Sequence, residues 1–338
     1  MVKFKGKRIK NENVYSKLDN RQLFHYEITN VEETLATIHG EAFKKYRRKW
    51  DAAVELREIP EVPLYIILET NSYCNMKCKM CTRNFFSTQK RINISEEIVD
   101  RIVQQCKEYN VPSVFVGAAA ECLINPEIKE ILRKMKSINN LDCFLITNGY
   151  NLDEDMANFL IDIQFERVYI SLDAAREDTY EKIRGLDLHH VENNVNQLLR
   201  IREERGSVLP LVRVSFVIQE DNREEQEEFF NKWKDKVDII DYQCLIDYKD
   251  LDNLAEIDEL PETDFQCVNP FRTLVIDYEG NIFPCSSDYA YHMPVGNIMQ
   301  MSIKEAWNSE KMKNLRTSIL ERSLCKVCRN CIAHNAIQ

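Results

Sequence analysis

Asn71-Ser-Tyr-Cys-Asn-Met-Lys-Cys-Lys-Met-Cys-Thr-Arg83 is the stretch from which the organisation of this chain can be worked out. Its three cysteines, Cys74, Cys78 and Cys81, follow the apolar run 64–68, which has the length and composition of a buried strand. We therefore expect the cysteines on a loop at the carboxyl end of that strand. Three thiolates from one short segment can there bind a single inorganic centre.

Two kinds of metal centre are compatible with three cysteines at this spacing. A zinc site needs a fourth ligand, commonly Cys or His at short spacing, yet no His occurs between His39 and His189. An iron-sulfur cube can be held by cysteines alone, and three of them leave one iron with an open position. From Asn71 to Ser95 there are basic residues and no acid, which suits an anionic thiolate cluster. The alternative of three core cysteines is disfavoured, because thiols this close together on a loop rarely all pack inward.

The length and composition are those of a soluble globular protein with two domains. The chain has 338 residues, of which 44% are hydrophobic and 30% charged, and one domain is expected per ~100 to 200 residues. No run reaches the ~18 apolar residues of a membrane span, and the basic amino terminus lacks the apolar core of a signal peptide. We therefore expect a cytoplasmic protein without a membrane partner. In that compartment 12 cysteines indicate metal binding or catalysis rather than disulfides. A net charge of −10 argues against a nucleic-acid partner.

Strand-like and helix-like segments alternate from residue 64 to about residue 245. The expected strands are 64–68, 113–116, 143–146, 168–171, 212–218 and 237–244, with helices near 95–106, 127–135, 153–163, 177–205 and 223–235. This order predicts an α/β fold with a parallel sheet, right-handed crossovers and sites at the carboxyl ends of the strands. It does not distinguish an open sheet from a partial barrel. Residues 1–62 are expected to form a helical amino-terminal extension.

The spacing Cys74-x-x-x-Cys78-x-x-Cys81 after a first strand resembles the cluster loop of radical S-adenosylmethionine (SAM) enzymes. In that family the open iron of a [4Fe-4S] cluster takes the amino and carboxylate groups of SAM, and one electron cleaves SAM to a 5'-deoxyadenosyl radical. The resemblance implies a partial (β/α)6 TIM-like barrel over residues 63–255. Met80 stands where the family often has an aromatic residue and would lie near the adenine.

Later stretches at the expected strand ends are similar to the SAM-binding motifs of this family. The loop 117–122, Gly-Ala-Ala-Ala-Glu-Cys, resembles the Gly-Gly-Glu loop, although alanines replace glycines. The resemblance implies that Ala120 and Glu121 meet the SAM amino group. Asn148 belongs to a Thr-Asn-Gly turn after the third strand, and Ser171 ends the fourth strand in Ser-Leu-Asp; both are implied near the cofactor.

Two arginines are candidates to hold the SAM carboxylate. Arg184 lies in Tyr-Glu-Lys-Ile-Arg-Gly, a stretch similar to one of the family, and Arg213 lies on the fifth strand. Arginine suits this role because it can bond a planar carboxylate through two parallel hydrogen bonds. An ordinary surface charge is the alternative for each of them.

A second set of cysteines lies in the expected carboxyl-terminal domain, 256–338. It comprises Cys267, Cys285, Cys325, Cys328 and Cys331, with an amphipathic helix around 303–320. The arrangement Cys267-x12-Gly280-x4-Cys285 closely resembles the SPASM/twitch extension, which binds an auxiliary iron-sulfur cluster. A tight turn at Gly280 would place Cys285 opposite Cys267. Five cysteines suffice for one auxiliary [4Fe-4S] cluster, and the choice among Cys325, Cys328 and Cys331 stays open, as does a zinc ribbon.

The resemblance implies an enzyme that abstracts a hydrogen atom from a substrate carbon. The single auxiliary cluster and the segment 46–50 resemble enzymes that modify sugars or aminocyclitols, so a carbohydrate-like small molecule is favoured, with oxidation of a carbinol carbon as the expected outcome. Epimerisation, with Cys122 or Cys244 as hydrogen-atom donor, is an alternative, although core packing is favoured for both thiols. Maturation of a ribosomal peptide, by epimerisation or cross-linking, is the second substrate class. A flavodoxin or ferredoxin is the expected electron donor, and a non-enzymatic iron-sulfur carrier or sensor is the third hypothesis.

Overall fold

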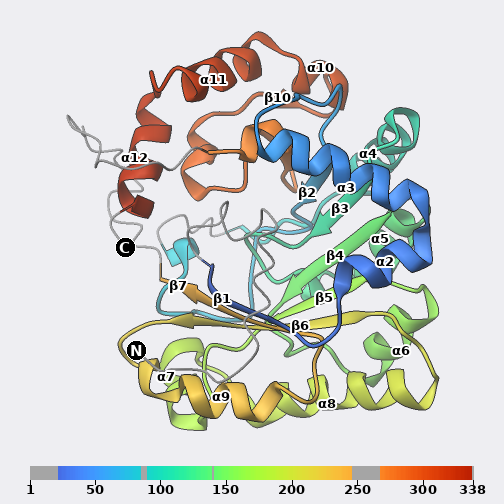
Figure 1. Cartoon of the computed structure of the whole chain (residues 1–338), viewed down its shortest axis with the longest axis vertical. Helices are drawn as coiled ribbons and strands as arrows, with labels where there is room; N and C mark the ends of the chain where they lie inside the picture. Colours follow the sequence, from blue (N-terminus) through green and yellow to red (C-terminus); the bar gives the residue numbers. More distant parts are fainter. Residues whose placement is uncertain (1–21, 85–89, 139–140, 246–266, 337–338) are drawn as a thin grey trace.

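The computed structural model describes residues 22–84, 90–138, 141–245 and 267–336. Within these ranges the strands form one sheet, in the order β1-β7-β6-β5-β4-β3-β2-β8-β9-β10. Strands β2 to β7 are mutually parallel, and helices connect them (Figure 1). The predicted α/β partial barrel is confirmed.

The parallel strands and their helices lie close to the predicted ranges. The strands are β2 (Tyr65–Leu68), β3 (Ser113–Val116), β4 (Asp142–Thr147), β5 (Arg167–Ser171), β6 (Leu211–Ile218) and β7 (Ile239–Cys244). The helices are α4 (Glu96–Tyr109), α5 (Ile128–Lys136), α6 (Glu154–Asp162), α7 (Glu177–Arg184), α8 (Leu188–Glu204) and α9 (Gln226–Trp233). Side-chain caps define the helix starts: Ser95 accepts a hydrogen bond from Ile98 N, and Asp153 accepts one from Met156 N.

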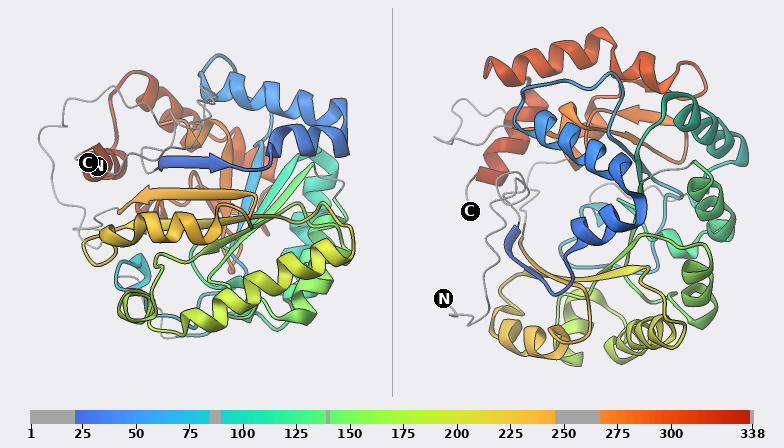
Figure 2. Two further views of the ribbon diagram at one scale, coloured as in Figure 1. Left: turned by 60° about the horizontal axis from the view of Figure 1, so that its bottom comes forward. Right: turned by 45° about the vertical axis from the view of Figure 1, so that its right-hand side comes forward.

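Alternate residues of the parallel strands pack on opposite faces of the sheet. On the outer face, Val114, Ile170 and their equivalents join the core formed with helices α4 to α9. Figure 2 shows the sheet curving with these helices around its outside. On the concave face, Tyr65, Ile67 and Phe115 pack against the amino-terminal helices. Burial on both faces explains why β2 and β3 are continuous runs of buried residues rather than alternating ones.

The amino-terminal extension begins with a strand instead of a helix. Strand β1 (Gln22–Glu27) pairs antiparallel with β7 and places His25 opposite Asp241. The prediction of a helical extension therefore holds for α2 (Val31–His39) and α3 (Glu41–Val54) but is wrong for residues 22–27. Pairing with the exposed edge of β7 decides the conformation here, and such tertiary context overrides local propensity.

The carboxyl-terminal segment continues the same sheet. Strand β8 (Thr273–Ile276) pairs parallel with β2, and β9 (Asn281–Phe283) and β10 (Gly296–Asn297) extend the sheet in antiparallel fashion. The predicted tight turn lies between β8 and β9, where Gly280 has φ +81° and Asp277 accepts hydrogen bonds from Glu279 N and Asn281 N. A left-handed residue at this turn favours glycine.

The helix predicted around 303–320 is two helices. They are α10 (Ile303–Trp307) and α11 (Glu310–Leu320), separated because Ser309 caps the start of α11 through Met312 N. Helix α12 (Lys326–Ala336) follows. Ile303 N donates to Gln105 Oε1 on α4 at 2.5 Å, so the carboxyl-terminal helices pack directly against the barrel. None of the described helices combines the length and the hydrophobicity needed to cross a bilayer.

His25 attaches β1 to the sheet through two carboxylates. Its Nδ1 lies 2.5 Å from Asp241 Oδ1, and its Nε2 lies 2.9 Å from Glu27 Oε1. Burial lowers the pKa of His25, but the two hydrogen bonds and the negative charges of Asp241 and Glu27 together outweigh burial and raise the pKa to about 9. A folded-state pKa above the unfolded value of about 6.5 adds stability that is fully present below that pH and is lost as the pH rises through 9.

We therefore predict that the free energy of unfolding falls between pH 6.5 and pH 9, and that His25→Asn reduces this fall. The measurement is urea unfolding at both pH values. His189→Asn, on the exposed surface of α8, is the matched control. An unchanged pH dependence in the His25 variant would contradict the assignment.

Candidate active site at the carboxyl ends of the strands

The three amino-terminal cysteines lie on the loop that follows β2. Cys78 is buried, and Cys74 and Cys81 are half-buried. Nitrogen-bound hydrogens point at the sulfurs: Met76 N donates to Cys74 Sγ at 3.4 Å, and Arg184 Nη1 donates to Cys78 Sγ at 3.6 Å. Such donors stabilise negative charge on thiolates and on cluster sulfurs. The donor set therefore fits an iron-sulfur cluster.

Loading this loop with iron requires the thiols to ionise. Burial raises the pKa of Cys74 and of Cys81 above the ordinary value for a thiol. As the side chains stand, no three Cys, His, Asp or Glu groups in the described ranges converge closely enough to hold a metal ion. Cluster binding therefore releases protons and draws the three thiols closer together.

Hydrogen bonds from neighbouring elements fix the backbone of the loop. Asn71 Nδ2 donates to the carbonyls of Tyr73, at 2.6 Å, and Glu121, at 3.2 Å. Asn84 Nδ2 donates to the carbonyl of Cys78 at 2.9 Å. Lys79 N donates to the carbonyl of Ile183 on α7, also at 2.9 Å. The loop is thus held from the β3 side and from the α7 side.

Glu121 is buried between the carboxyl ends of β3 and β4. Its Oε1 accepts from Thr147 Oγ1 at 2.7 Å and from Leu123 N at 3.0 Å, and its Oε2 accepts from Asn148 N at 2.7 Å. Burial raises the pKa of this carboxyl group, although the three hydrogen bonds oppose the rise. In this structure the carboxylate therefore organises its own loop, and a contact with SAM remains a prediction.

Gly117 makes the tight course of that loop possible. Its φ is +85°, and a Cβ at this position would lie 2.9 Å from Cys122 Sγ and 3.1 Å from the carbonyl oxygen of Ile146. A side chain would therefore be both strained and crowded. Cys122 itself is fully buried, and its thiol donates to the Ile146 carbonyl at 3.5 Å, which agrees with the favoured core assignment.

The remaining predicted contacts of SAM follow neighbouring parallel strands. Asn148 Nδ2 donates to Asn75 Oδ1 of the cysteine loop at 2.7 Å. Met80 Sδ accepts from Gln219 Nε2 at 3.8 Å. Ala120 and Ser171 are half-buried after β3 and at the end of β5. The structure places these residues at one edge of the sheet, as the topology predicts, and their contacts with SAM stay predictions.

The two arginines proposed for the SAM carboxylate both have acidic partners. Arg184 pairs with the buried Asp173 beside the cysteine loop. Arg213 Nη1 lies 2.8 Å from Asp241 Oδ2, and its guanidinium stacks over the ring of Tyr169 at 3.7 Å. An arginine that bound the SAM carboxylate here would therefore bring that group close to its own acidic partner, Asp173 or Asp241.

Arg213, Asp241 and His25 form a polar cluster that sequence reasoning missed. Its members come from β6, β7 and β1, and only the strand pairing places them side by side. One signal was available: the strand 212–218 alternates Val212, Val214 and Phe216 with polar residues, and alternation in a parallel strand indicates a face that is not part of the apolar core.

The carboxyl-terminal cysteines gather at the start of α12. The thiol of Cys328 and backbone N–H groups at the helix start stabilise the Cys325 thiolate, which lowers the pKa of Cys325 to about 6. The same hydrogen bond raises the pKa of Cys328, and negative charge on nearby Cys285 and Cys267 raises it further. These four thiols are therefore near enough for their charges to affect one another, although as the side chains stand no three of them converge on one metal position. The Sγ of Cys331, one helical turn after Cys328, lies 3.2 Å from Ser287 Oγ.

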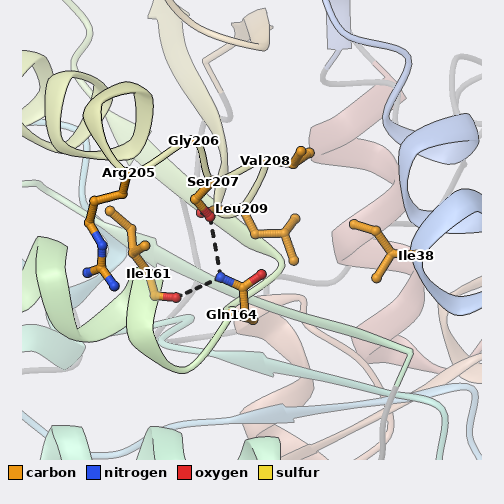
Figure 3. Close-up of a pocket in the computed structure, with 8 residues that line it drawn as sticks. All are labelled: Ile38, Ile161, Gln164, Arg205, Gly206, Ser207, Val208 and Leu209. Atoms are coloured by element: carbon orange, nitrogen blue, oxygen red, sulfur yellow. Dashed lines mark hydrogen bonds between the residues drawn. The ribbon is translucent and has the colours of Figure 1, made fainter.

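A pocket among the described residues lies away from all these groups. Figure 3 shows it between α2, the turn after α6 and the loop before β6, lined by residues such as Ile38, Gln164 and Val208. The loop before β6 is at the amino ends of the parallel strands. The pocket therefore does not belong to the cysteine site.

Two family models match the chain over both regions described above. The radical SAM superfamily matches residues 68–232, and the SPASM iron-sulfur cluster-binding domain matches residues 267–332. The chain belongs to the radical SAM superfamily. The predicted cofactors of this radical SAM protein are thereby confirmed as a SAM-binding [4Fe-4S] cluster, SAM and an auxiliary iron-sulfur cluster.

Curated relatives match part of this radical SAM chain. It is 23% identical over 166 residues to the tungsten-containing aldehyde ferredoxin oxidoreductase cofactor-modifying protein of Pyrococcus furiosus, covering 48% of this chain and 46% of that protein. It is 28% identical over 100 residues to the S-adenosyl-L-methionine-dependent 2-deoxy-scyllo-inosamine dehydrogenase of Niallia circulans, covering 29% and 40%. The chain thus spans less than half the length of these relatives.

Solved structures share the fold over most of the chain. The crystal structure of BtrN in complex with AdoMet and 2-DOIA superposes with a TM-score of 0.55 and 18% identity, covering 80% of this chain and 92% of that one. Streptococcus suis SuiB bound to S-adenosylmethionine gives a TM-score of 0.59 and 14% identity, covering 86% and 77%. At these identities the comparison establishes the fold.

The first prediction for this site concerns Glu121. Glu121→Gln places an amide against three hydrogen-bond donors, which leaves a buried donor without an acceptor at a cost of about 1–3 kcal/mol. The resemblance implies a further hydrogen bond from the SAM amino group to Glu121; losing this charge-assisted bond, worth about 1.5–3 kcal/mol, should weaken SAM binding by roughly 10- to 150-fold with iron content unchanged. Equilibrium dialysis of the anaerobic protein measures SAM binding, and iron analysis measures cluster content. Glu130→Gln, an exposed ion-pair partner on α5, is the control, and equal affinities would show that the loop does not serve SAM.

The second prediction selects the auxiliary ligands. Because the charges of Cys325, Cys285 and Cys267 act on Cys328 whereas Cys331 Sγ contacts Ser287 Oγ, Cys328→Ala should lose the auxiliary cluster and Cys331→Ala should keep it. Iron analysis with Mössbauer spectroscopy distinguishes a loss of about four irons, one cubane, from no loss. The opposite pattern, with iron lost only in the Cys331 variant, would reassign the fourth ligand.

Proposed function

We propose that this chain is a radical SAM oxidoreductase that oxidises a carbinol carbon of a carbohydrate-like or aminocyclitol-like small molecule to a ketone. The observation that carries the proposal is that two separate cysteine sets are attached to one continuous sheet, with Cys328 near enough to Cys325, Cys285 and Cys267 to feel their charges. When bound, the reduced cluster and SAM supply a 5'-deoxyadenosyl radical, and the auxiliary cluster supplies an electron acceptor. The cysteines of this chain hold both inorganic groups.

Polar side chains on the concave face support a hydroxyl-rich substrate. Glu69, just after β2, is buried and accepts a hydrogen bond from Tyr291 Oη. Arg213 and Asp241 lie further round the same face. Hydroxyl groups both donate and accept, so a mixed set of carboxylate, guanidinium and phenol groups can bind several of them. The carboxylates of Glu69 and Asp241 can also take the hydroxyl proton that oxidation releases.

Similar proteins point to the same class of substrate. The Niallia circulans relative is a 2-deoxy-scyllo-inosamine dehydrogenase, and the BtrN structure contains 2-DOIA. We infer in addition that a flavodoxin or ferredoxin delivers the first electron and that the reaction takes place in the cytoplasm.

A peptide substrate is the second candidate. It is favoured by the fold similarity to SuiB, which has been crystallised with the precursor peptide SuiA at a TM-score of 0.57 to this chain. Epimerisation of such a peptide needs a hydrogen-atom donor at the site. The complete burial of Cys122 and its hydrogen bond to Ile146 argue against Cys122 in that role.

Incubation in deuterated water tests the proposal. With SAM, a reductant and a panel of aminocyclitols, oxidation predicts a ketone and one 5'-deoxyadenosine per product, without deuterium at the reacting carbon. Mass spectrometry and NMR measure both products. The Cys74→Ala/Cys78→Ala/Cys81→Ala variant is the control and should give neither product. Deuterium at an inverted carbon, or turnover of peptides alone, would replace the dehydrogenase assignment.

A further inference from the structure

Arg184 presents a buried positive charge to the sulfur of Cys78. It is the last residue of α7, which ends at Gly185 in the left-handed conformation. Its Nη1 donates to Cys78 Sγ at 3.6 Å, and its Nη2 donates to Asp173 Oδ2. Asp173 is 0% exposed and Arg184 is 9% exposed. The hydrogen bond from Lys79 N to the carbonyl of Ile183 fixes the cysteine loop next to this guanidinium.

Asp173 is held in place by contacts on its other side. Its φ is +64°, in the left-handed region, which costs a non-glycine residue about 1–2 kcal/mol. Its Oδ1 accepts from Val217 N at 2.7 Å, and its backbone carbonyl accepts from Asn222 Nδ2 at 2.8 Å. Such strain persists only where the surroundings fix the conformation. The aspartate is therefore anchored so that its second oxygen faces Arg184.

The guanidinium remains charged in this setting. Arginine stays protonated in proteins, and the adjacent Asp173 carboxylate further favours the charged guanidinium. The positive charge of Arg184 is thus balanced by the Asp173 carboxylate, and the guanidinium also donates a hydrogen bond to the Cys78 sulfur. Breaking such a buried pair by removing one partner leaves an uncompensated charge, whereas the intact pair adds little stability.

Two ordinary roles account poorly for this arrangement. A purely structural ion pair needs only Asp173, yet the second terminal nitrogen of the guanidinium is directed at a predicted cluster ligand. A clamp for the SAM carboxylate would place that group beside the Asp173 carboxylate, and like charges in a buried site repel each other. Neither role requires the contact with Cys78.

We propose that Arg184 sets the reduction potential of the SAM-binding cluster through its hydrogen bond to Cys78, as a positioning residue that Asp173 holds in place. The proposal rests on Cys78 being a cluster ligand. Hydrogen bonds to cluster sulfurs are among the factors that fix the potential of iron-sulfur clusters. A donor withdraws charge from the sulfur, so the one electron that the external reductant adds is better stabilised, and the potential rises.

The test is an EPR-monitored redox titration of the full-length anaerobic protein without SAM. The signal of this cluster is the one that is absent from the Cys74/Cys78/Cys81 alanine variant. We expect Arg184→Met to make the cluster about tenfold harder to reduce, which for one electron is a potential about 59 mV lower. Omitting SAM matters because a clamp for the SAM carboxylate would leave this potential unchanged.

Arg176→Met is the matched control, because Arg176 lies at the other end of α7 in an exposed ion pair with Glu228. Circular dichroism and iron analysis establish that each variant is folded and loaded. If Arg184→Met does not load iron, Arg184→Lys decides: one ammonium does not reproduce the fork that bonds Asp173 and Cys78 together, so a lower potential is again expected. A loaded Arg184 variant with the potential of the Arg176 control would overturn the proposal. A wild-type protein without a cysteine-loop signal would instead refute the cofactor assignment itself.

Discussion

The parallel pairing of β2 with β3 on one side and β8 on the other is the constraint on which the rest of the structure depends. Ile66 lies opposite both Val114 and Leu274, and all four residues of β2 are buried. A shift of one residue would exchange the side chains that pack in the two separate cores, Ile66 and Leu68 on one face and Tyr65 and Ile67 on the other. The register therefore fixes where the cysteine loop leaves the sheet, and it attaches the SPASM segment to the barrel through the same strand.

Around the cysteine loop, hydrogen bonds between buried polar groups connect the loops that follow the parallel strands. Glu121, Asn71 and Asn125 connect the end of β2 to the loop after β3, with Asn125 Nδ2 donating to the Thr70 carbonyl at 2.8 Å. Asp173 and Asn222 connect the ends of β5 and β6, because both form hydrogen bonds with the backbone of Val217. In a low-dielectric interior an unpaired polar group is costly, so such a network permits essentially one arrangement of the loop. The result is a preorganised edge of the sheet at which thiols, an arginine and hydrogen-bond donors face the same place.

Much of this could be predicted from the sequence for identifiable reasons. The six parallel strands are short apolar runs bounded by polar and turn residues, and the spacing of Cys74, Cys78 and Cys81 is specific enough to indicate the cluster loop. Strand β1 could not be predicted, because its pairing partner β7 lies more than 200 residues away and its own sequence has no strong strand pattern. The break between α10 and α11 at Ser309 was not predicted, because the apolar periodicity of the sequence continues across both helices.

The partners of charged residues were the least predictable part. Arg184 and Asp173 are both present in motifs recognised from the sequence, yet nothing in the spacing shows that they pair with each other. The same holds for the choice among three closely spaced cysteines, which depends on how α12 approaches Cys267 and Cys285. Distances between elements settle such questions, and a single sequence does not contain them.

The central claim is that the chain holds two separate iron-sulfur centres, one on each cysteine set. The most direct measurement is the iron and sulfide content of the anaerobically prepared protein, together with its Mössbauer spectrum. The account predicts about eight irons per chain in two cubane clusters, and about four in a protein whose Cys74, Cys78 and Cys81 are alanine. A wild-type protein with a single cluster that requires both cysteine sets would contradict it.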